Sequence, residues 1–449
     1  MKNFIVLCGS LLVGVTSVAG ELDNAILVGR TDRHPFAYEV GEEAVFSIRL
    51  EQAQPFLDGT YFLRWRTQAD GGETFRGREP LSYGKPVTVK ARIATNGFVR
   101  ILSYVCDRKG NRCRRKIRAD GLTPEGQKAM NAGETKSKDI IFNGAAAAHP
   151  ELMRSVPEPV DFDAFWAKRK AALAAVPMEV DLKEHPSASP VVKCFTFSIA
   201  CAGPRPVTGS LTVPSKPGKY PAEITFHGYG KAFVQKPPRT GPADRLHMFI
   251  NAHGYELERE PAYYTAFYES IMSNGYTFGI DPEQNADPDK AYFGGMTYRI
   301  MRALEYLKSR PEWDGRNLTA AGGSMGGLQA IWAGALDHDV TKISALVPWC
   351  CDMGGRVTLR RFYPGRPKET VALRYFDPVN LAKRIPQTTW VDIPRAGLGD
   401  ESSPPNGVAV LWNNLGCKKS IRWVQGATHG EEPPKEFREE YVFNEDQRK

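Results

Sequence analysis

Several features that would indicate other classes of protein are absent from this sequence. After residue 20, no segment reaches the run of about 18 apolar residues that a transmembrane helix requires, so we expect no membrane insertion once a leader is removed. The cysteines form no C-x-x-C pair and have no close histidine at a metal-ligand spacing, which predicts no metal site. Histidine is scarce, at 8 of 449 residues, so any catalytic base must come from a short set of candidates.

Strong charge of one sign is also lacking. The net charge is +8 over 449 residues, and the composition of 42% hydrophobic and 24% charged residues is that of a globular protein. One basic cluster could meet an acidic polysaccharide or a phosphate backbone, but we favour a solvated edge hairpin that its charge keeps from pairing, and we expect no nucleic-acid partner. The cluster comprises Arg108, Lys109, Arg112, Arg114, Arg115, Lys116 and Arg118.

Residues 1–20 have the pattern of a secretory signal peptide. Lys2 precedes an apolar stretch over residues 4–18, and Ser17-Val18-Ala19 provides small residues for cleavage. We therefore expect an exported protein, periplasmic or extracellular. In that oxidising setting the turn between Cys106 and Cys113 favours a disulfide across a hairpin, and a similar bridge could join Cys194 and Cys201.

The mature chain divides into two segments with different predicted secondary structure. In residues 21–142, β-type runs such as 44–50 and 87–91 alternate with turns, which predicts an antiparallel immunoglobulin-like sandwich. It carries no Ser/His/Asp set, so we expect it to support the second domain rather than bind glycan. Residues 143–449 alternate strands with helices, which predicts a three-layer α/β domain with a mostly parallel sheet. Within it we expect strands at 222–226, 276–280 and 317–321 and a helix over 298–309.

The motif Gly322-Gly323-Ser324-Met325-Gly326-Gly327 lies between the predicted strand 317–321 and a helical segment. In that context G-x-S-x-G is typical of a nucleophile elbow, which exposes a serine hydroxyl at the top of a sheet. The plainer interpretation is a glycine-rich turn that packs a helix closely against a strand. We favour the elbow and predict Ser324 as the nucleophile of an acyl-transfer reaction.

A serine nucleophile needs a base and a group that orients the base, and in enzymes of this architecture the chain order is Ser, Asp or Glu, His. His429 alone lies far downstream of Ser324, in a loop after the predicted strand 420–424. Asp400 follows the predicted strand 388–393, so we predict it as the orienting acid. Glu401 and Asp392 are weaker rivals, and Asp392 lies inside the strand. The alternative for His429 is an ordinary surface position in a terminal loop.

An oxyanion hole requires two N–H donors, one from the residue after the nucleophile and one from an early strand-end loop. Met325 supplies the first. The loop at His227-Gly228-Tyr229-Gly230 directly follows the strand 222–226, so we predict the N–H of Tyr229 as the second. A second copy of this tripeptide, His253-Gly254-Tyr255, is not expected to follow a strand, although it could line the pocket.

The blocks over residues 155–440 resemble the acetyl xylan esterases, the seventh carbohydrate esterase family, which includes cephalosporin C deacetylases. The resemblance implies an α/β-hydrolase that removes acetyl groups from sugar hydroxyls without a metal or organic cofactor. It also implies Ser324, Asp400 and His429 as the triad and Tyr229 and Met325 as oxyanion donors, and we add His227, Gln284 and Trp349 as substrate contacts. It rests on Asp161-Phe162-Asp163-Ala164-Phe165-Trp166, His227-Gly228-Tyr229, the serine motif, Val347-Pro348-Trp349, Tyr375-Phe376-Asp377-Pro378-Val379-Asn380, Gly397-Leu398-Gly399-Asp400, Pro404-Pro405 and His429.

The chain departs from the family pattern at three places. Residues 281–285 stand where we expect the family's Arg-Gly-Gln motif, which helps to order the site. Met325 replaces a usual glutamine, which matters little if only its N–H is used, and Gly430 replaces a usual glutamate. These changes indicate a divergent branch of the family.

The function predicted from the sequence is that of a secreted esterase that deacetylates an oligo- or polysaccharide through an acetyl-serine intermediate. One alternative is a serine peptidase of the prolyl oligopeptidase kind, but residues 21–142 are too short for the propeller that such enzymes carry. The other is an inactive carbohydrate-binding protein.

Overall fold

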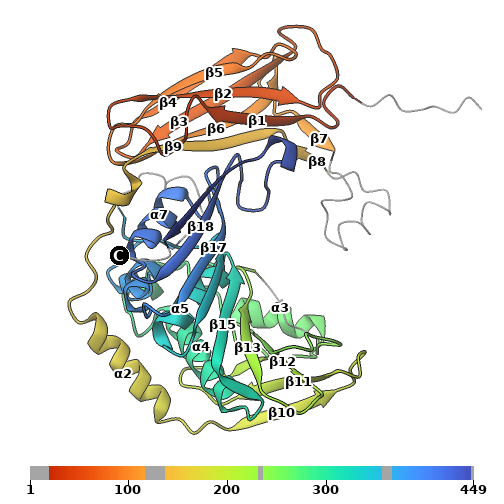
Figure 1. The fold of residues 1–449 in the computed structure, drawn as a ribbon, viewed down its shortest axis with the longest axis vertical. Coiled ribbons are helices and arrows are strands. Elements are labelled where there is room, and N and C mark those ends of the chain that lie inside the picture. Colours follow the sequence, from red (N-terminus) through yellow and green to blue (C-terminus); the bar gives the residue numbers. More distant parts are fainter. Residues whose placement is uncertain (1–19, 117–136, 231–235, 356–366, 446–449) are drawn as a thin grey trace, which may run out of the picture.

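The N-terminal part of the chain folds into antiparallel sheets that face each other (Figure 1). The computed structural model describes residues 20–116, 137–230, 236–355 and 367–445, so the predicted signal segment lies almost wholly outside the described residues. One sheet has the order β1(Ile26–Thr31)-β2(Glu43–Glu51)-β5(Val87–Arg92), and the other β4(Thr74–Pro80)-β3(Tyr61–Ala69)-β6(Gly97–Asp107)-β9(Ile141–Ala148). A separate pair joins β7(Arg114–Lys116) and β8(Ser137–Asp139).

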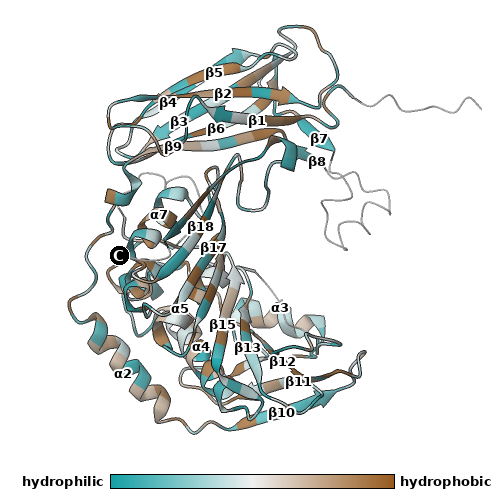
Figure 2. Cartoon of the chain, viewed as in Figure 1, coloured by the Kyte–Doolittle hydropathy of each residue, from teal (hydrophilic) through white to brown (hydrophobic). Residues whose placement is uncertain are grey.

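Alternating side chains fill the core between these sheets. Phe46 and Ile48 of β2 are buried on the same face, as a period of two residues requires, and they share one apolar cluster with Leu63 and Ile101 of the facing sheet. The alternation is visible along the strands in Figure 2. The predicted boundary at residue 142 falls inside β9, because residues 141–148 pair with β6 and complete the sandwich. We therefore propose a domain boundary after residue 148.

The C-terminal part is built on a ten-stranded sheet that is parallel at its centre. The parallel strands are β14(Leu246–Ile250), β13(Tyr220–Phe226), β15(Trp313–Gly323), β16(Lys342–Leu346), β17(Trp390–Gly397) and β18(Lys418–Gln425), in that spatial order. Antiparallel strands extend both edges, with β10(Val180–His185), β11(Val192–Ile199) and β12(Val207–Pro214) beyond β14 and β19(Glu439–Glu445) beyond β18. Because the carboxyl ends of parallel strands lie at one edge, loops far apart in sequence meet there.

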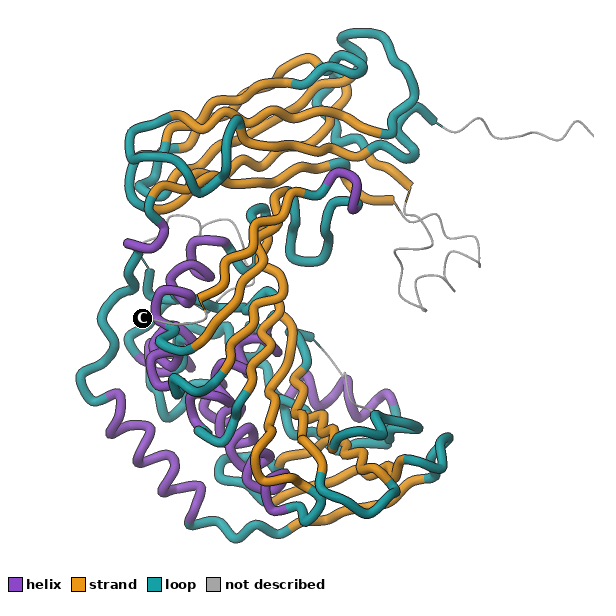
Figure 3. The backbone as a smooth tube through the Cα atoms, in the orientation of Figure 1, coloured by secondary structure: helices purple, strands orange, loops and turns teal. Residues whose placement is uncertain are grey.

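Helices pack together on one face of this sheet (Figure 3), and its central strands alternate buried apolar residues with partly exposed ones. The α-helices are α2(Phe162–Ala174), α3(Pro261–Ser270), α4(Tyr292–Ser309), α5(Met325–Leu336), α6(Pro378–Leu381) and α7(Pro405–Asn414). Short 3-10 turns form at η2(Pro150–Leu152), η3(Gln284–Ala286), η5(Ala372–Tyr375), η6(Ala382–Arg384) and η7(Lys435–Phe437). In α4 the helical spacing of Ile300, Leu304 and Leu307 buries all three in the core, as predicted. Within the described residues, no helix is long and apolar enough to span a membrane.

One predicted strand and both predicted disulfides are absent from the described structure. Residues 276–280 form turns, since Gly275 and Gly279 adopt positive φ angles of 76° and 74°. The segment between Cys194 and Cys201 is mostly strand β11 rather than a turn. Five strand residues span about 17 Å, which separates the two cysteines far beyond the reach of a disulfide. Cys106 and Cys113 are likewise free thiols.

The sandwich packs directly against the carboxyl edge of the large sheet (Figure 1). The Gln425 side chain at the end of β18 accepts from the backbone N–H of Ala145 at 3.1 Å and donates to the carbonyl of Ala145 at 2.9 Å. A Cβ atom on Gly399 would lie 2.1 Å from the carbonyl oxygen of Asn143. These contacts join β9 to the two loops that follow β17 and β18.

Candidate active site

Ser324 occupies the sharp turn between β15 and α5. Its φ of 59° and ψ of −118° are unusual for a residue with a side chain, and backbone hydrogen bonds hold them in place. The Ser324 N–H donates to the carbonyl of Leu346 at 2.9 Å, and its carbonyl accepts from the N–H of Trp349 at 3.1 Å. The turn therefore presents the hydroxyl at the carboxyl edge of the sheet, the geometry of a nucleophile elbow.

The glycines of the motif are required by close backbone packing. A Cβ atom on Gly326 would lie 2.2 Å from the carbonyl oxygen of Phe226, and one on Gly322 would lie 2.5 Å from the carbonyl carbon of Gly326. Side chains at these positions would push α5 away from β13 and β15. Close packing of a helix on a strand therefore explains the glycines of the motif. It does not explain the unusual backbone angles of Ser324.

A chain of hydrogen bonds joins Ser324 to the two downstream residues predicted with it. The Ser324 hydroxyl lies 2.8 Å from Nε2 of His429, and Nδ1 of His429 lies 2.9 Å from Oδ2 of Asp400. Since a carboxylate only accepts, Nδ1 carries the proton that it donates to Asp400, and Nε2 is free to accept from Ser324. The Asp400 side chain is fully buried, whereas that of His429 is 30% exposed.

Asp400 is fixed by the loop that carries it. Its Oδ1 accepts from the backbone N–H groups of Ser402 and Ser403, each at 2.8 Å, which leaves Oδ2 for His429. The two rival acids point elsewhere. Asp392 accepts from the hydroxyl of Ser420 on the neighbouring strand, and Glu401 lines a hollow beneath the sandwich. The structure brings Asp400, and neither rival, to His429.

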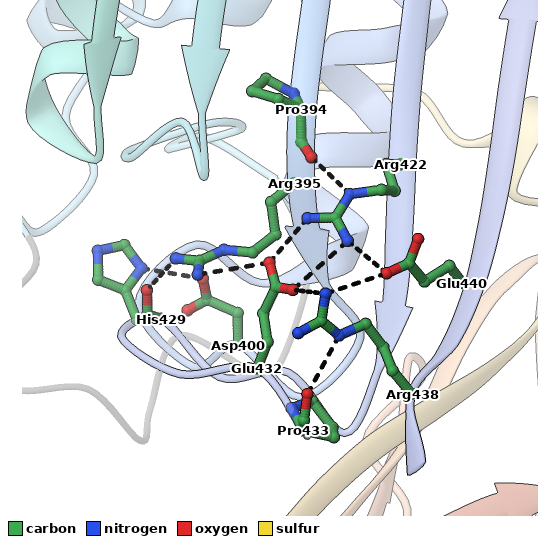
Figure 4. A network of polar contacts seen from close by, with 9 residues as sticks. All are labelled: Pro394, Arg395, Asp400, Arg422, His429, Glu432, Pro433, Arg438 and Glu440. Atoms are coloured by element: carbon green, nitrogen blue, oxygen red, sulfur yellow. Dashed lines mark hydrogen bonds and ion pairs between the residues drawn. The ribbon is translucent and has the colours of Figure 1, made fainter. Parts of the chain in front are cut away.

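An ion-pair network supports the loop of His429, and sequence reasoning missed it (Figure 4). Arg395 at the end of β17 donates to the carbonyl of His429 at 2.7 Å. Glu432 then pairs with Arg422 at 2.8 Å, Arg438 at 2.9 Å and Arg395 at 3.7 Å. One carboxylate that is 15% exposed is thus shared by three guanidinium groups from separate segments, and Glu440 also pairs with Arg422 and Arg438. Because the partners are distant in sequence, no local motif predicts this arrangement.

Replacing this central carboxylate should loosen the histidine loop. In Glu432→Gln, Arg422 and Arg438 would keep their pairs with Glu440, but Arg395 would lose its carboxylate partner and its hold on His429 would weaken. We expect unfolding free energy to fall by about 1–3 kcal/mol, as for loss of a partly buried charged hydrogen-bond partner, and kcat to fall with it. Calorimetry and p-nitrophenyl acetate kinetics measure both, with exposed Glu436→Gln as the control. Equal behaviour of the two variants would show that the network does not support the loop.

The predicted oxyanion donors belong to two segments that adjoin the serine. Met325 is the first residue of α5, where backbone N–H groups have no partner inside the helix, and its side chain is fully buried, so only its backbone faces the site. A Cβ atom on Gly228 would lie 3.8 Å from Cβ of Ser324, so the loop of Tyr229 runs beside the nucleophile. The Tyr229 ring stacks on Phe278 at 4.2 Å, and its hydroxyl donates to Thr277 at 2.7 Å.

His227 is placed to link two loops rather than to face a substrate. Its Nε2 accepts from the backbone N–H of Ala252 at 3.1 Å, so its Nδ1 carries the proton and donates to the carbonyl of Gly228 at 2.8 Å. Burial lowers the pKa of His227 to about 4, which keeps the imidazole neutral near pH 7. The predicted substrate contact is therefore not supported by its position.

The other two predicted substrate contacts, Trp349 and Gln284, differ in whether they make a hydrogen bond to Ser324. Trp349 donates its backbone N–H to the carbonyl of Ser324, and its buried ring lies 5.3 Å from that of Tyr229. Gln284 lies on η3, and within the described residues it makes no hydrogen bond to the serine, histidine or aspartate. The structure brings Trp349 next to the serine, while the prediction for Gln284 stays a prediction.

The segment His253-Gly254-Tyr255 does follow a strand, contrary to the sequence prediction. Strand β14 pairs with β13 in parallel and with β12 in antiparallel, and residues 251–255 leave its carboxyl end. Residues 281–285 come later in the chain, between α3 and α4, and end in η3. His253 is fully buried, its Nδ1 lies 2.9 Å from the Tyr292 hydroxyl, and burial lowers its pKa well below the usual value. It is therefore a neutral part of the loop packing.

The described parts of the chain contain no group of three or more His, Cys, Asp or Glu side chains that could hold a metal ion. The groups that the site brings together are the hydroxyl, imidazole, carboxylate and backbone N–H groups described above. A serine hydroxyl with a base, an orienting acid and adjacent N–H donors can form and hydrolyse an acyl-serine.

The fold and the serine turn place this chain in the α/β-hydrolase class. Residues 150–447 match the family model of acetyl xylan esterases (AXE1). The chain belongs to the acetyl xylan esterase family.

Two curated relatives are similar over part of their length. Acetyl esterase Axe7A of Xylanibacter ruminicola is 31% identical over 290 residues, which cover 60% of this chain and 63% of that protein. Putative hydrolase YtaP of Bacillus subtilis is 28% identical over 165 residues, or 31% of this chain and 54% of that protein.

Two solved structures share the fold of the C-terminal part. The acetyl xylan esterase from Paenibacillus sp. R4 has a TM-score of 0.51 at 23% identity, covering 63% of this chain and 94% of that one. Acetyl xylan esterase 1 from Thermoanaerobacterium sp. JW/SL YS485 has a TM-score of 0.51 at 22% identity, covering 64% and 94%. At these identities the likeness shows the fold, and the sandwich contributes little to the shared length.

Proposed function

We propose that this protein is a serine esterase that removes acetyl groups from acetylated saccharides. The observation that carries the proposal is the hydrogen-bond chain from Ser324 through His429 to buried Asp400, on a chain of the acetyl xylan esterase family. The curated relative Axe7A, an acetyl esterase, is consistent with it. The present chain spans 63% of that relative's length, so the substrate is inferred from the site and the family together.

In the proposed mechanism, His429 accepts the proton of Ser324 as the hydroxyl attacks the ester carbonyl. Asp400 stabilises the imidazolium that forms, and the N–H groups of Tyr229 and Met325 hold the oxyanion. The protonated histidine then gives its proton to the departing ester oxygen of the sugar, which is released as a hydroxyl, and an acetyl-serine remains. Water, deprotonated by the same histidine, attacks this ester and releases acetate, and the proton returns to Ser324.

The proposed function is tested by comparing the release of acetate from esters with the cleavage of peptide substrates. We expect the enzyme to release acetate from acetylated xylo-oligosaccharides and p-nitrophenyl acetate, and to leave peptide p-nitroanilides intact. We also expect a fluorophosphonate probe to label Ser324, since only an activated serine reacts. Acetate is measured enzymatically and labelling by mass spectrometry. Preferred cleavage of the anilides would indicate a peptidase, and the absence of both labelling and turnover would indicate an inactive binding protein.

We further propose that residues 1–20 direct export and that the sandwich supports the catalytic domain. The first rests on the signal-like pattern of the sequence. Support for the second comes from the contacts of β9 with the loops after β17 and β18, including the paired hydrogen bonds between Gln425 and Ala145.

A further inference from the structure

One face of the sandwich gathers arginine side chains by strand register. In the four-stranded sheet, Arg66 of β3 lies directly opposite Arg76 of β4, and Arg64 lies directly opposite Arg78. Tyr104 of β6 is the partner of Arg64 on the other side. Residues directly opposite each other, or two apart on one strand, point to the same face of a sheet. The arginines of β3 and β4 therefore form a single patch.

This patch borders a hollow of about 420 Å³ next to the proposed catalytic acid. The hollow, called here the arginine hollow, is lined among others by Arg64, Arg66, Arg76, Tyr104, Arg112 and Glu401. Glu401 directly follows Asp400, so the arginine hollow joins the sandwich to the loop that orients His429. Burial lowers the pKa of Arg66, and Arg76 adds to this effect while Glu401 opposes it.

Two arginines that line the arginine hollow, Arg64 and Arg76, lack the carboxylate partners that neighbouring basic residues have among the described residues. In the neighbouring basic hairpin, Arg112 and Arg114 pair with Asp139 at 2.6 and 3.4 Å, and Lys116 pairs with Asp23 at 2.6 Å. By contrast, Arg64 and Arg76 form no ion pair with any of the residues that the structure describes. The ion pairs balance the charge of the hairpin, in line with the solvated edge that we favoured. The unpaired positive charge lies instead on the face of the four-stranded sheet that carries Arg64 and Arg76.

Arg78 does not restore the balance, because it donates to the carbonyls of Asp107 and Arg108 and meets no carboxylate there. Like charges directly opposite on a sheet are unfavourable by roughly 0.2–1 kcal/mol per pair. Two such pairs side by side are a cost to the sandwich that a bound anion would remove. Among the described residues that line the arginine hollow, Glu401 is the single acidic one, so the site is suited to an anion from outside the chain.

We propose that the arginine hollow binds the carboxylate of a uronic acid unit, and that the acetylated substrate is an acidic polysaccharide. Guanidinium groups bind carboxylates in a planar, two-point geometry, which favours a carboxylated sugar over a neutral one. Since Glu401 is adjacent to Asp400, a glycan held there would extend from the sandwich toward the site of deacetylation. This inference rests on the proposed function for the identity of the reacting ester, while the binding step depends on the arginines of the sandwich and not on Ser324.

Binding is tested in the Ser324→Ala protein, which removes turnover from the measurement. The probes are a xylo-oligosaccharide that carries one glucuronic acid branch, the same molecule with its carboxyl reduced to an alcohol, and a sulfated xylo-oligosaccharide, each titrated by calorimetry. We expect the acidic probe to bind at least tenfold more tightly than its reduced form, and this preference to disappear in Arg64→Gln/Arg76→Gln. A charge-matched control, Arg30→Gln/Arg92→Gln on the other sheet, should keep it.

The same arginine variants in the active enzyme separate this inference from the proposed function. Hydrolysis of p-nitrophenyl acetate should be unchanged by Arg64→Gln/Arg76→Gln, whereas KM for an acetylated, glucuronic acid-bearing xylan should rise and circular dichroism should stay that of the parent. Equal binding of the acidic and reduced probes, or tighter binding of the sulfated one, would overturn the uronate site. Failure of the parent enzyme to hydrolyse any acetate ester would overturn the proposed function and leave the binding result to stand.

Discussion

Ser324→Ala is expected to lower kcat on p-nitrophenyl acetate by roughly 10⁴- to 10⁶-fold, the range found when a triad serine is removed from other hydrolases. The hydroxyl is the atom that would form the acetyl-enzyme, and its 2.8 Å hydrogen bond to His429 has no replacement in alanine. Binding of the ester through the loop of Tyr229 should persist, so KM should change far less than kcat.

The fold should tolerate this change. Alanine is smaller than serine, and the backbone bonds of residue 324 to Leu346 and Trp349 do not involve the side chain. Circular dichroism and the melting temperature should therefore match the parent. Ser309→Ala, which removes a hydroxyl at the end of α4 that donates to a backbone carbonyl, serves as the control and should retain activity. Substantial turnover by Ser324→Ala would reject this serine as the nucleophile.

Asp400→Asn is expected to lower kcat by about 10⁴-fold, the effect of the same change in a serine protease triad. The amide can still accept the N–H groups of Ser402 and Ser403 through its oxygen, which directs its NH₂ group toward His429. That donor would favour the tautomer with the proton on Nε2, and this nitrogen could no longer accept from Ser324. The loss arises from tautomer and charge, so the loop should stay folded.

Kinetics on p-nitrophenyl acetate and a thermal melt check this prediction together. Asp392→Asn is the matched control, because it makes the same chemical change on the same segment at a residue that contacts Ser420 instead of His429. We expect it to retain most activity. If the two variants lost equal activity, or if Asp400→Asn lost little, the assignment of Asp400 would be wrong.

The sequence allowed the serine, histidine and aspartate to be predicted because each follows a strand with a readable pattern. In a parallel sheet, the carboxyl ends of β15, β17 and β18 must lie at one edge, so the chain order alone brings Ser324, Asp400 and His429 to that edge. Their hydrogen-bond distances agree with the prediction. The roles themselves await the experiments above.

The features that sequence reasoning missed all depend on pairing between distant segments. Strand β14 has only five residues, and its place between β12 and β13 is set by partners that a local pattern does not reveal. The apolar run at 276–280 resembles a strand, but its glycines turn the chain away from the sheet. The network around Glu432 and the opposed arginines of β3 and β4 arise from loop packing and from register, which a single sequence does not specify.

Gly399 shows how far the two domains depend on each other. It belongs to the loop that presents Asp400, yet the atom that forbids a side chain there is the carbonyl oxygen of Asn143 in the sandwich. A mutation tolerated in a relative without this sandwich would be excluded here, and an exchange of sandwiches would change which residues the catalytic loop accepts. A substitution at this contact in either domain therefore changes what the other can accommodate, and Asn143 lies outside the segment that the family model matches.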